Sequence, residues 1–120
     1  MSLTIAMITI DTGDPRKLAE FWTAALNTTI QNDWGGEFIV LAPNAEHGVA
    51  LGLQQVPDAT PGKNRVHFDS HVPDRKAEVA RLVALGATEV AVHSVPGLVW
   101  SVLADPEGNE FCVGQAGEEL

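Results

Sequence analysis

The feature that most constrains the fold is an internal repeat that spans half of the 120-residue chain. The segment MITIDTGDPRKLAEFWTAALN in the first half corresponds to HFDSHVPDRKAEVARLVALG in the second, with Asp14 aligned on Asp74, 60 residues later. In each copy a β-rich stretch runs into an aspartate and is followed by a helical pattern. Internal repeats determine architecture. Because this one is long and occurs only twice, it predicts a duplicated module.

Both copies predict one helix with clear end signals. Asp14 is a good N-cap, and Pro15 takes the first helical position, where a missing N–H costs nothing. Asn27 is suited to the left-handed conformation that ends a helix. Asp74 caps the second helix, and Gly86 ends it. Apolar residues at spacings of three and four form the predicted inner faces: Leu18, Phe21, Trp22, Ala25 and Leu26, then Val79, Leu82 and Val83.

The rest of the chain reads as short strands separated by Gly, Pro and Asn turn signals. The expected strands are Leu3–Asp11, Thr28–Asp33, Glu37–Leu41, Gly48–Gln55, Asn64–His71, Thr88–His93, Leu98–Ala104 and Glu110–Gly114. Each module is therefore strand, helix and three strands. We expect one α+β domain over residues 1–120, with a first module over about 1–56, a linker over about 57–63 and a second module over about 64–116.

Composition excludes several classes of protein. Hydrophobic residues make up 45% of the chain and charged residues 19%, which is typical of a globular domain and not of a disordered chain. A net charge of −9 disfavours nucleic acid and favours neutral or cationic small partners. No apolar run is long enough for a membrane span, and we find no signal-peptide pattern. The single cysteine, Cys112, fits a cytoplasmic protein.

The motifs DTGDPRKLAEFWTAALN, NRVHFDSHVPD and WSVLADPEGNEF, within a doubled βαβββ pattern, resemble the glyoxalase, bleomycin-resistance and extradiol-dioxygenase superfamily. This superfamily is also called the vicinal oxygen chelate superfamily, and the motifs resemble its glyoxalase-like members in particular. The resemblance implies that the sheet of each module curls into a half-open barrel with the helix outside and a ligand cavity inside. It also implies a homodimer. Whether the modules pair within one chain or between two chains stays open.

The resemblance further implies where a divalent metal would bind, with one ligand each from the first, fourth, fifth and eighth strands. The matching positions are Met7, Gln54, His67 and Cys112. A thioether is soft and neutral, and an amide carries no charge, so this set poorly suits the hard or borderline ions of such enzymes. We therefore expect no metal cofactor, with Met7 and Cys112 as small hydrophobic side chains of a cavity wall. A soft site from Met7, His67 and Cys112 is the less favoured alternative.

Strand alternation extends the candidate cavity, because side chains two apart share a face. If His67 points inward, so do Asp69 and His71, and if Met7 points inward, so do Thr9 and Asp11. The opposite face would pack on the helices through Ile8, Ile10, Val66 and Phe68. His67 with Asp69 or Glu110 would supply acid–base chemistry near neutral pH. In the alternative, Asp69 and His67 only hydrogen-bond each other or the backbone. His47 and His93 fit solvated positions better.

Two tryptophans are candidates for ligand contact. Trp34 precedes Gly35 and Gly36 in a predicted hairpin turn, where its indole would cover the cavity or contact a partner. Trp100 begins the seventh strand, where it lines the pocket or packs on the sheet.

The sequence supports two hypotheses of function. The first is a protein that binds a cationic or aromatic small molecule in the cavity without the usual metal, as bleomycin-resistance members do. The second is a glyoxalase-like lyase, isomerase or dioxygenase that uses His67 with a non-standard metal site or acid–base chemistry. Missing metal ligands favour the first hypothesis.

Overall fold

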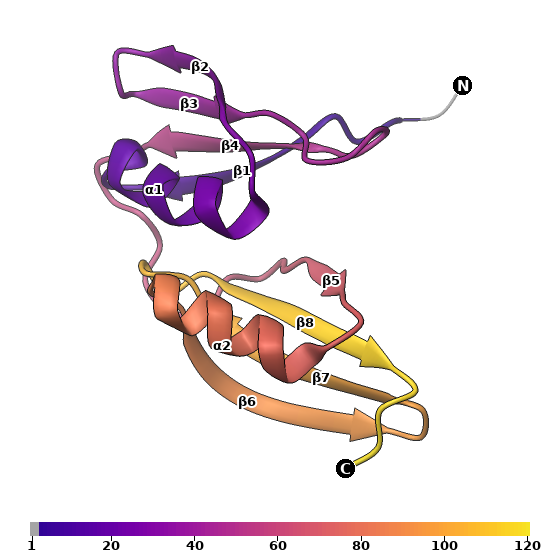
Figure 1. Cartoon of the computed structure of the whole chain (residues 1–120). Coiled ribbons are helices and arrows are strands. Elements are labelled where there is room, and N and C mark those ends of the chain that lie inside the picture. The colour runs from indigo at the N-terminus through magenta and orange to yellow at the C-terminus, as the bar shows by residue number, and fades with distance from the viewer. Residues whose placement is uncertain (1–2) are drawn as a thin grey trace. The chain divides into compact units, whose positions relative to one another are not determined.

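The computed structural model describes residues 3–120 and consists of two compact units, Met1–Ala59 and Thr60–Leu120 (Figure 1). Each unit holds one helix and one four-stranded sheet, which confirms two tandem βαβββ modules of the α+β class. The first unit comprises β1 (Met7–Thr12), α1 (Pro15–Leu26), β2 (Ile30–Trp34), β3 (Phe38–Leu41) and β4 (Ala50–Gln55). The second comprises β5 (Asp69–His71), α2 (Arg75–Leu85), β6 (Thr88–Val95), β7 (Leu98–Ala104) and β8 (Glu110–Ala116).

The two sheets have the same topology. Their strand orders are β1-β4-β3-β2 and β5-β8-β7-β6. The first strand of each module runs parallel to the last one, and the other pairs are antiparallel. A parallel pair needs a long connection, and the helix of each unit lies within that connection.

The helix signals in the sequence are confirmed. The Asp14 side chain accepts a hydrogen bond from the Lys17 N–H, and Asn27 takes the left-handed conformation at φ 50°. Asp74 caps α2 in the same way, and Gly86 follows it at φ 124°. One prediction on α2 is wrong: Val83 is 46% exposed. The buried stripe of α2 is narrow and consists of Arg75, Val79 and Leu82, which leaves Val83 at its edge.

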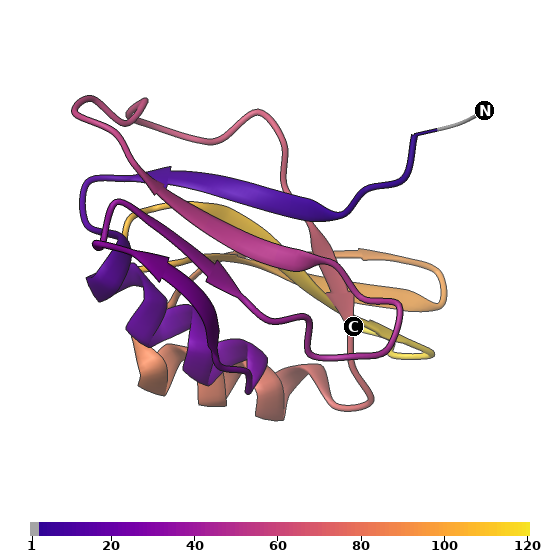
Figure 2. The same cartoon turned by 90° about the horizontal axis from the view of Figure 1, so that it is seen from above.

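Each helix covers one face of its own sheet, and Figure 2 shows the helix of each unit on one side of its strands. The core of the first unit is built around Trp22 and Leu18 of α1, and that of the second around Val79 and Leu82 of α2. The buried strand residues beneath the helices are Ile39, Leu41, Leu51 and Leu53 in the first unit and Val99, Leu103, Phe111 and Val113 in the second.

The second unit also buries a charge. Arg75 is only 4% exposed, and its guanidinium forms an ion pair with Glu118 at 2.8 Å. It also donates to the Ser101 hydroxyl, which donates in turn to Glu89. The hydrogen bond between Arg75 and Glu118 raises the pKa of the guanidinium and lowers that of the carboxyl. The pair holds the C-terminal segment against the start of α2.

The predicted strand Asn64–His71 is shorter than expected, because only Asp69–His71 pairs as a strand. The Asn64 side chain takes over part of the pairing: its amide donates to the Glu110 carbonyl and accepts from the Glu110 N–H. Val66 is consequently 82% exposed and does not pack on a helix. Phe68 stacks on the buried Phe111 of β8, with ring centroids 5.9 Å apart.

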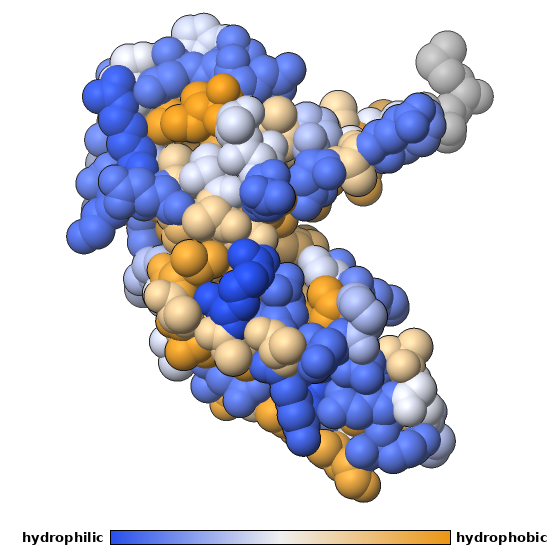
Figure 3. Space-filling view, viewed as in Figure 1, coloured by the Kyte–Doolittle hydropathy of each residue, from blue (hydrophilic) through white to orange (hydrophobic). Residues whose placement is uncertain are grey.

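Surface hydropathy is mixed, and Figure 3 shows hydrophobic and hydrophilic residues interspersed over the face in view. Large exposed hydrophobic side chains include Trp34, Val66 and Val92. Within residues 3–120, neither helix has the length and apolar character that crossing a membrane requires.

Candidate functional site

The second sheet has a polar face opposite α2, and two adjoining hollows of about 220 Å³ each lie on it. Strand alternation separates this face from the core, because Val99, Ser101 and Leu103 of β7 are fully buried while the residues between them are partly exposed. Trp100 and Cys112 line both hollows. The first hollow is also lined by Lys63, His67, His93, Val102 and Glu110, and the second by Asp69, His71, Leu98 and Gly114.

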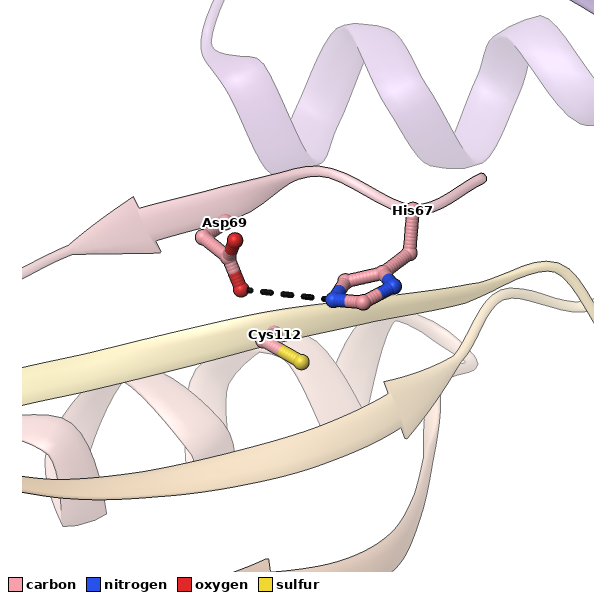
Figure 4. Close-up of side chains that lie close together, drawn as sticks. All are labelled: His67, Asp69 and Cys112. Atoms are coloured by element: carbon pink, nitrogen blue, oxygen red, sulfur yellow. Dashed lines mark ion pairs between the residues drawn. The ribbon is translucent and has the colours of Figure 1, made fainter. Parts of the chain in front are cut away.

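Three side chains of different chemistry converge on this face (Figure 4), and each of them lines at least one of the hollows. His67 precedes β5, Asp69 begins it, and Cys112 lies directly opposite Asp69 on β8. One potential ligand atom from each residue lies within 4.8 Å of the others. The Nε2 of His67 is 3.7 Å from an Asp69 carboxylate oxygen, too far for a hydrogen bond. The side chains of both residues are about half exposed, whereas Cys112 is 5% exposed.

Cys112 is held as a neutral thiol in the folded protein. Burial raises its pKa to about 11, and its hydrogen bond to the Asp69 carboxylate and that charge add to the effect. A thiol with this pKa is a weak nucleophile at neutral pH, because the thiolate is the reactive form.

His93 is exposed, as expected from the sequence, and it also lines the first hollow. It lies opposite Trp100 in the β6–β7 ladder, with ring centroids 5.5 Å apart and planes inclined by 34°. The turn sequence could have predicted this contact. A two-residue loop at Pro96 and Gly97 pairs Val95 with Leu98, and this register places His93 opposite Trp100.

The first unit has a different arrangement at the same place. Thr9 lies opposite Gly52 in the β1–β4 ladder, as Asp69 lies opposite Cys112 in the second unit. A Cβ atom on Gly52 would stand 2.8 Å from the Thr9 hydroxyl oxygen, 3.1 Å from the Met7 sulfur and 3.4 Å from the Phe38 ring. These three side chains therefore occupy the space that a side chain at position 52 would need.

The other residues of the first unit that were predicted to line the cavity, Asp11, Gln54 and Trp34, are exposed. Asp11 and Gln54 are register partners near the end of the β1–β4 ladder. Trp34 is 56% exposed and packs edge-on against Phe38, with ring centroids 5.7 Å apart. In the second unit, the Asn64 side chain positions Glu110 through hydrogen bonds with the Glu110 backbone N–H and carbonyl. The His71 ring lies close to the position that a Cβ on Gly114 would take.

The residues present do not fit the four-ligand metal site that the superfamily implies. The counterpart of Cys112 in the first module, 60 residues earlier, is Gly52, which has no side chain. The counterpart of His67 is Met7, a soft and neutral donor. Gln54, the other candidate, carries no charge. A hard or borderline ion prefers imidazole and carboxylate ligands, and these four positions offer one imidazole and no carboxylate.

Comparison with known proteins agrees with the fold. A family model described as a glyoxalase-like domain matches residues 7–114. No curated protein matches the chain significantly.

Several solved structures share the fold at low sequence identity. A glyoxalase/bleomycin resistance protein/dioxygenase family enzyme from Burkholderia phytofirmans PsJN is 19% identical with a TM-score of 0.75, over 92% of this chain and 97% of that one. A glyoxalase/bleomycin resistance protein/dioxygenase from Nocardioides is 20% identical with a TM-score of 0.74, over 100% of this chain and 87% of that one. A lactoylglutathione lyase from Agrobacterium tumefaciens is 16% identical with a TM-score of 0.71, over 96% and 95%.

The paired βαβββ units have the same fold as these solved structures. Because the family model covers residues 7–114, the chain belongs to the glyoxalase-like domain family.

Proposed function

We propose that the protein binds a small, flat organic molecule on the polar face of the second sheet, without the four-ligand metal site of its superfamily. The observation that carries this proposal is Trp100, whose side chain lines both hollows and is only partly exposed. An indole in this position offers a planar apolar surface for stacking. His93 extends that surface at 5.5 Å.

The charges around Trp100 favour a cationic ligand in the second hollow. Asp69 lines that hollow, and its lining within residues 3–120 includes no lysine or arginine. Lys63 lines the first hollow, where it faces the same space as Glu110. The net charge of −9 attracts cations from a distance. An aromatic compound with one positive group would stack on Trp100 and direct that group towards Asp69.

Binding is favoured over acid–base catalysis by the geometry of His67. A general base is normally oriented by a hydrogen-bond partner, and the 3.7 Å separation from Asp69 does not supply one. The thiol of Cys112 is neutral at physiological pH, so it does not act as a nucleophile. A lyase, isomerase or dioxygenase reaction is the competing hypothesis, and it predicts conversion of the bound compound.

The experiment is a thermal-shift screen of cationic aromatic compounds against chelator-treated protein. We expect a compound that stabilises the native protein and loses that effect in Trp100→Leu. The matched control is Trp34→Leu, which removes an exposed indole from the first unit and leaves binding intact. Equal loss in both variants would contradict the proposal, and so would affinity that does not change with salt concentration. Incubation of the compound with the protein, followed by mass spectrometry, detects turnover.

We further infer that the protein acts in the cytoplasm as a homodimer. A single cysteine supports the reducing compartment, and dimerisation is the expectation that the family resemblance carries. Light scattering of the purified chain tests the second point.

A further inference from the structure

We propose that His67, Asp69 and Cys112 bind one zinc-class divalent ion within the second unit. This site differs from the four-ligand arrangement of the superfamily, because it adds Asp69 and takes no ligand from the first unit. The organic ligand proposed above also uses Asp69, so the two are tested separately: the organic ligand on metal-free protein, and the ion without that ligand.

The donor set defines the class of ion. An imidazole nitrogen, a thiolate and a carboxylate oxygen are the three ligand types that zinc accepts, and three protein ligands leave a fourth position for water or substrate. Calcium and magnesium require oxygen ligands and are disfavoured by nitrogen and sulfur. The sequence analysis counted only His67 and Cys112 as good donors. Asp69 is the third, and the β5–β8 register places it directly opposite Cys112.

The geometry leaves little rearrangement for an ion to induce. Two ligand atoms about 2 Å from a tetrahedral ion lie roughly 3.3 Å apart, and the His67 nitrogen and Asp69 oxygen are already 3.7 Å apart. All three ligand atoms fall within 4.8 Å of one another. Neither His67 nor Asp69 saturates the other with a hydrogen bond at that distance.

Access and charge also agree with metal binding. Cys112 is largely buried, but it lines both hollows, so an ion reaches its sulfur from the open face. Binding displaces the Cys112 thiol proton to solvent, and the thiolate and the Asp69 carboxylate both become ligands. The β5–β8 register already places these two residues directly opposite each other.

The experiment titrates chelator-treated, tag-free protein with Zn²⁺ by calorimetry and with Co²⁺ by absorption spectroscopy. We expect one equivalent of either ion and a thiolate-to-cobalt charge-transfer band. Cys112→Ser removes the band and weakens Zn²⁺ binding by about 100-fold, and His67→Gln and Asp69→Asn each weaken it by at least about tenfold. Circular dichroism of the metal-free variants verifies that they are folded.

Three control variants separate this site from others. His71→Gln and His93→Gln change histidines on the same sheet face outside the cluster, and Met7→Leu changes the counterpart of His67 in the first unit. All three variants should bind one equivalent of Zn²⁺ or Co²⁺, and the thiolate-to-cobalt band should be intact. Absence of binding at micromolar ion overturns the proposal. So does a loss of the band in Met7→Leu, because the ion would then need the first unit.

Discussion

The two units of this protein have the same scaffold and different polar faces. Both cap their helix with an aspartate and arrange four strands in the same order. At three positions related by 60 residues, however, the first unit has Met7, Thr9 and Gly52, and the second has His67, Asp69 and Cys112.

This difference shows where a duplicated fold is free to diverge. The aspartate cap and most buried strand positions keep the same character in both copies, as in Ile39 and Val99 or Leu53 and Val113. Side chains on the sheet face opposite the helix contribute less to the core. In the first unit, Met7 and Thr9 fill the space above Gly52, whereas in the second unit the corresponding residues are potential ligands. The comparison assigns chemistry to the second unit and apolar packing to the first.

The largest expected effect concerns the start of the helix, where Pro15 in the first unit is replaced by the buried Arg75 in the second. Arg75→Met leaves Glu118 and Glu89 without their cation, and we expect a loss of about 3 kcal/mol in unfolding free energy. Arg81→Met is the control, because its ion pair with Glu78 lies on the surface and should contribute less than about 1 kcal/mol. Urea denaturation measures the unfolding free energy of both variants. Equal losses would contradict the special contribution of the buried Arg75.

A smaller loss of stability is expected from a methyl group added to the first unit. Gly52→Ala places a Cβ 2.8 Å from the Thr9 oxygen and should destabilise the protein by about 1–3 kcal/mol. Gly114→Ala, on the matching strand of the second unit, meets only ordinary contacts at 3.4 Å or more and should be close to neutral. Thr9→Ala should rescue Gly52→Ala. Thermal denaturation of Gly52→Ala, Gly114→Ala and the double variant tests this. If the double variant is as unstable as Gly52→Ala, Thr9 is not the residue that opposes the added Cβ.

The comparison between units also predicts unequal effects on ligand affinity. For a compound found by the thermal-shift screen, His67→Ala should lower affinity by about tenfold, a loss of about 1.4 kcal/mol, without lowering the melting temperature. The His67 side chain is about half exposed, so its truncation should cost the fold little. Met7→Ala changes the matching position of the first unit and should leave affinity unchanged. A His67→Ala variant that melts earlier but binds normally would make this residue structural.

The smallest effect is a dependence of stability on acid. The hydrogen bond from Arg75 holds the pKa of Glu118 below its ordinary value. The pair therefore contributes stability at neutral pH that is lost as the pH falls through that lowered pKa. Glu118→Gln should remove this part of the acid sensitivity. The free energy of unfolding is measured for the wild type and for Glu118→Gln at neutral pH and near pH 3. An equal loss of stability on acidification in both proteins would contradict this role of Glu118.

Much of the fold was predictable because local rules determined it. Asp14, Asn27, Asp74 and Gly86 function at the helix ends as capping chemistry requires. The sequence was less informative where a side chain took over strand pairing. The Asn64 side chain hydrogen-bonds to the Glu110 backbone, and β5 is shorter than predicted. The pattern of apolar and polar residues does not indicate a hydrogen bond of this kind.

The candidate site was predictable in part, since alternation placed His67 and Asp69 on one face. It could not show that Cys112 lies directly opposite Asp69, because that contact depends on the register between β5 and β8. The contact between His93 and Trp100 was missed for a different reason. It follows from the two-residue turn after Val95, which fixes a hairpin register that the strand pattern alone leaves undetermined.

The central claim is that the second unit, and not the first, carries the binding site. The chain has three tryptophans in three different environments: Trp22 is buried in the first core, Trp34 is exposed on the first unit, and Trp100 lines the hollows of the second. Nitrogen-15 NMR spectra of metal-free protein, titrated with a compound from the screen, therefore report on all three indole N–H groups at once. The account predicts that the Trp100 signal shifts while those of Trp22 and Trp34 stay in place. A shift of Trp34 with an unmoved Trp100 would contradict it and would assign the site to the first unit.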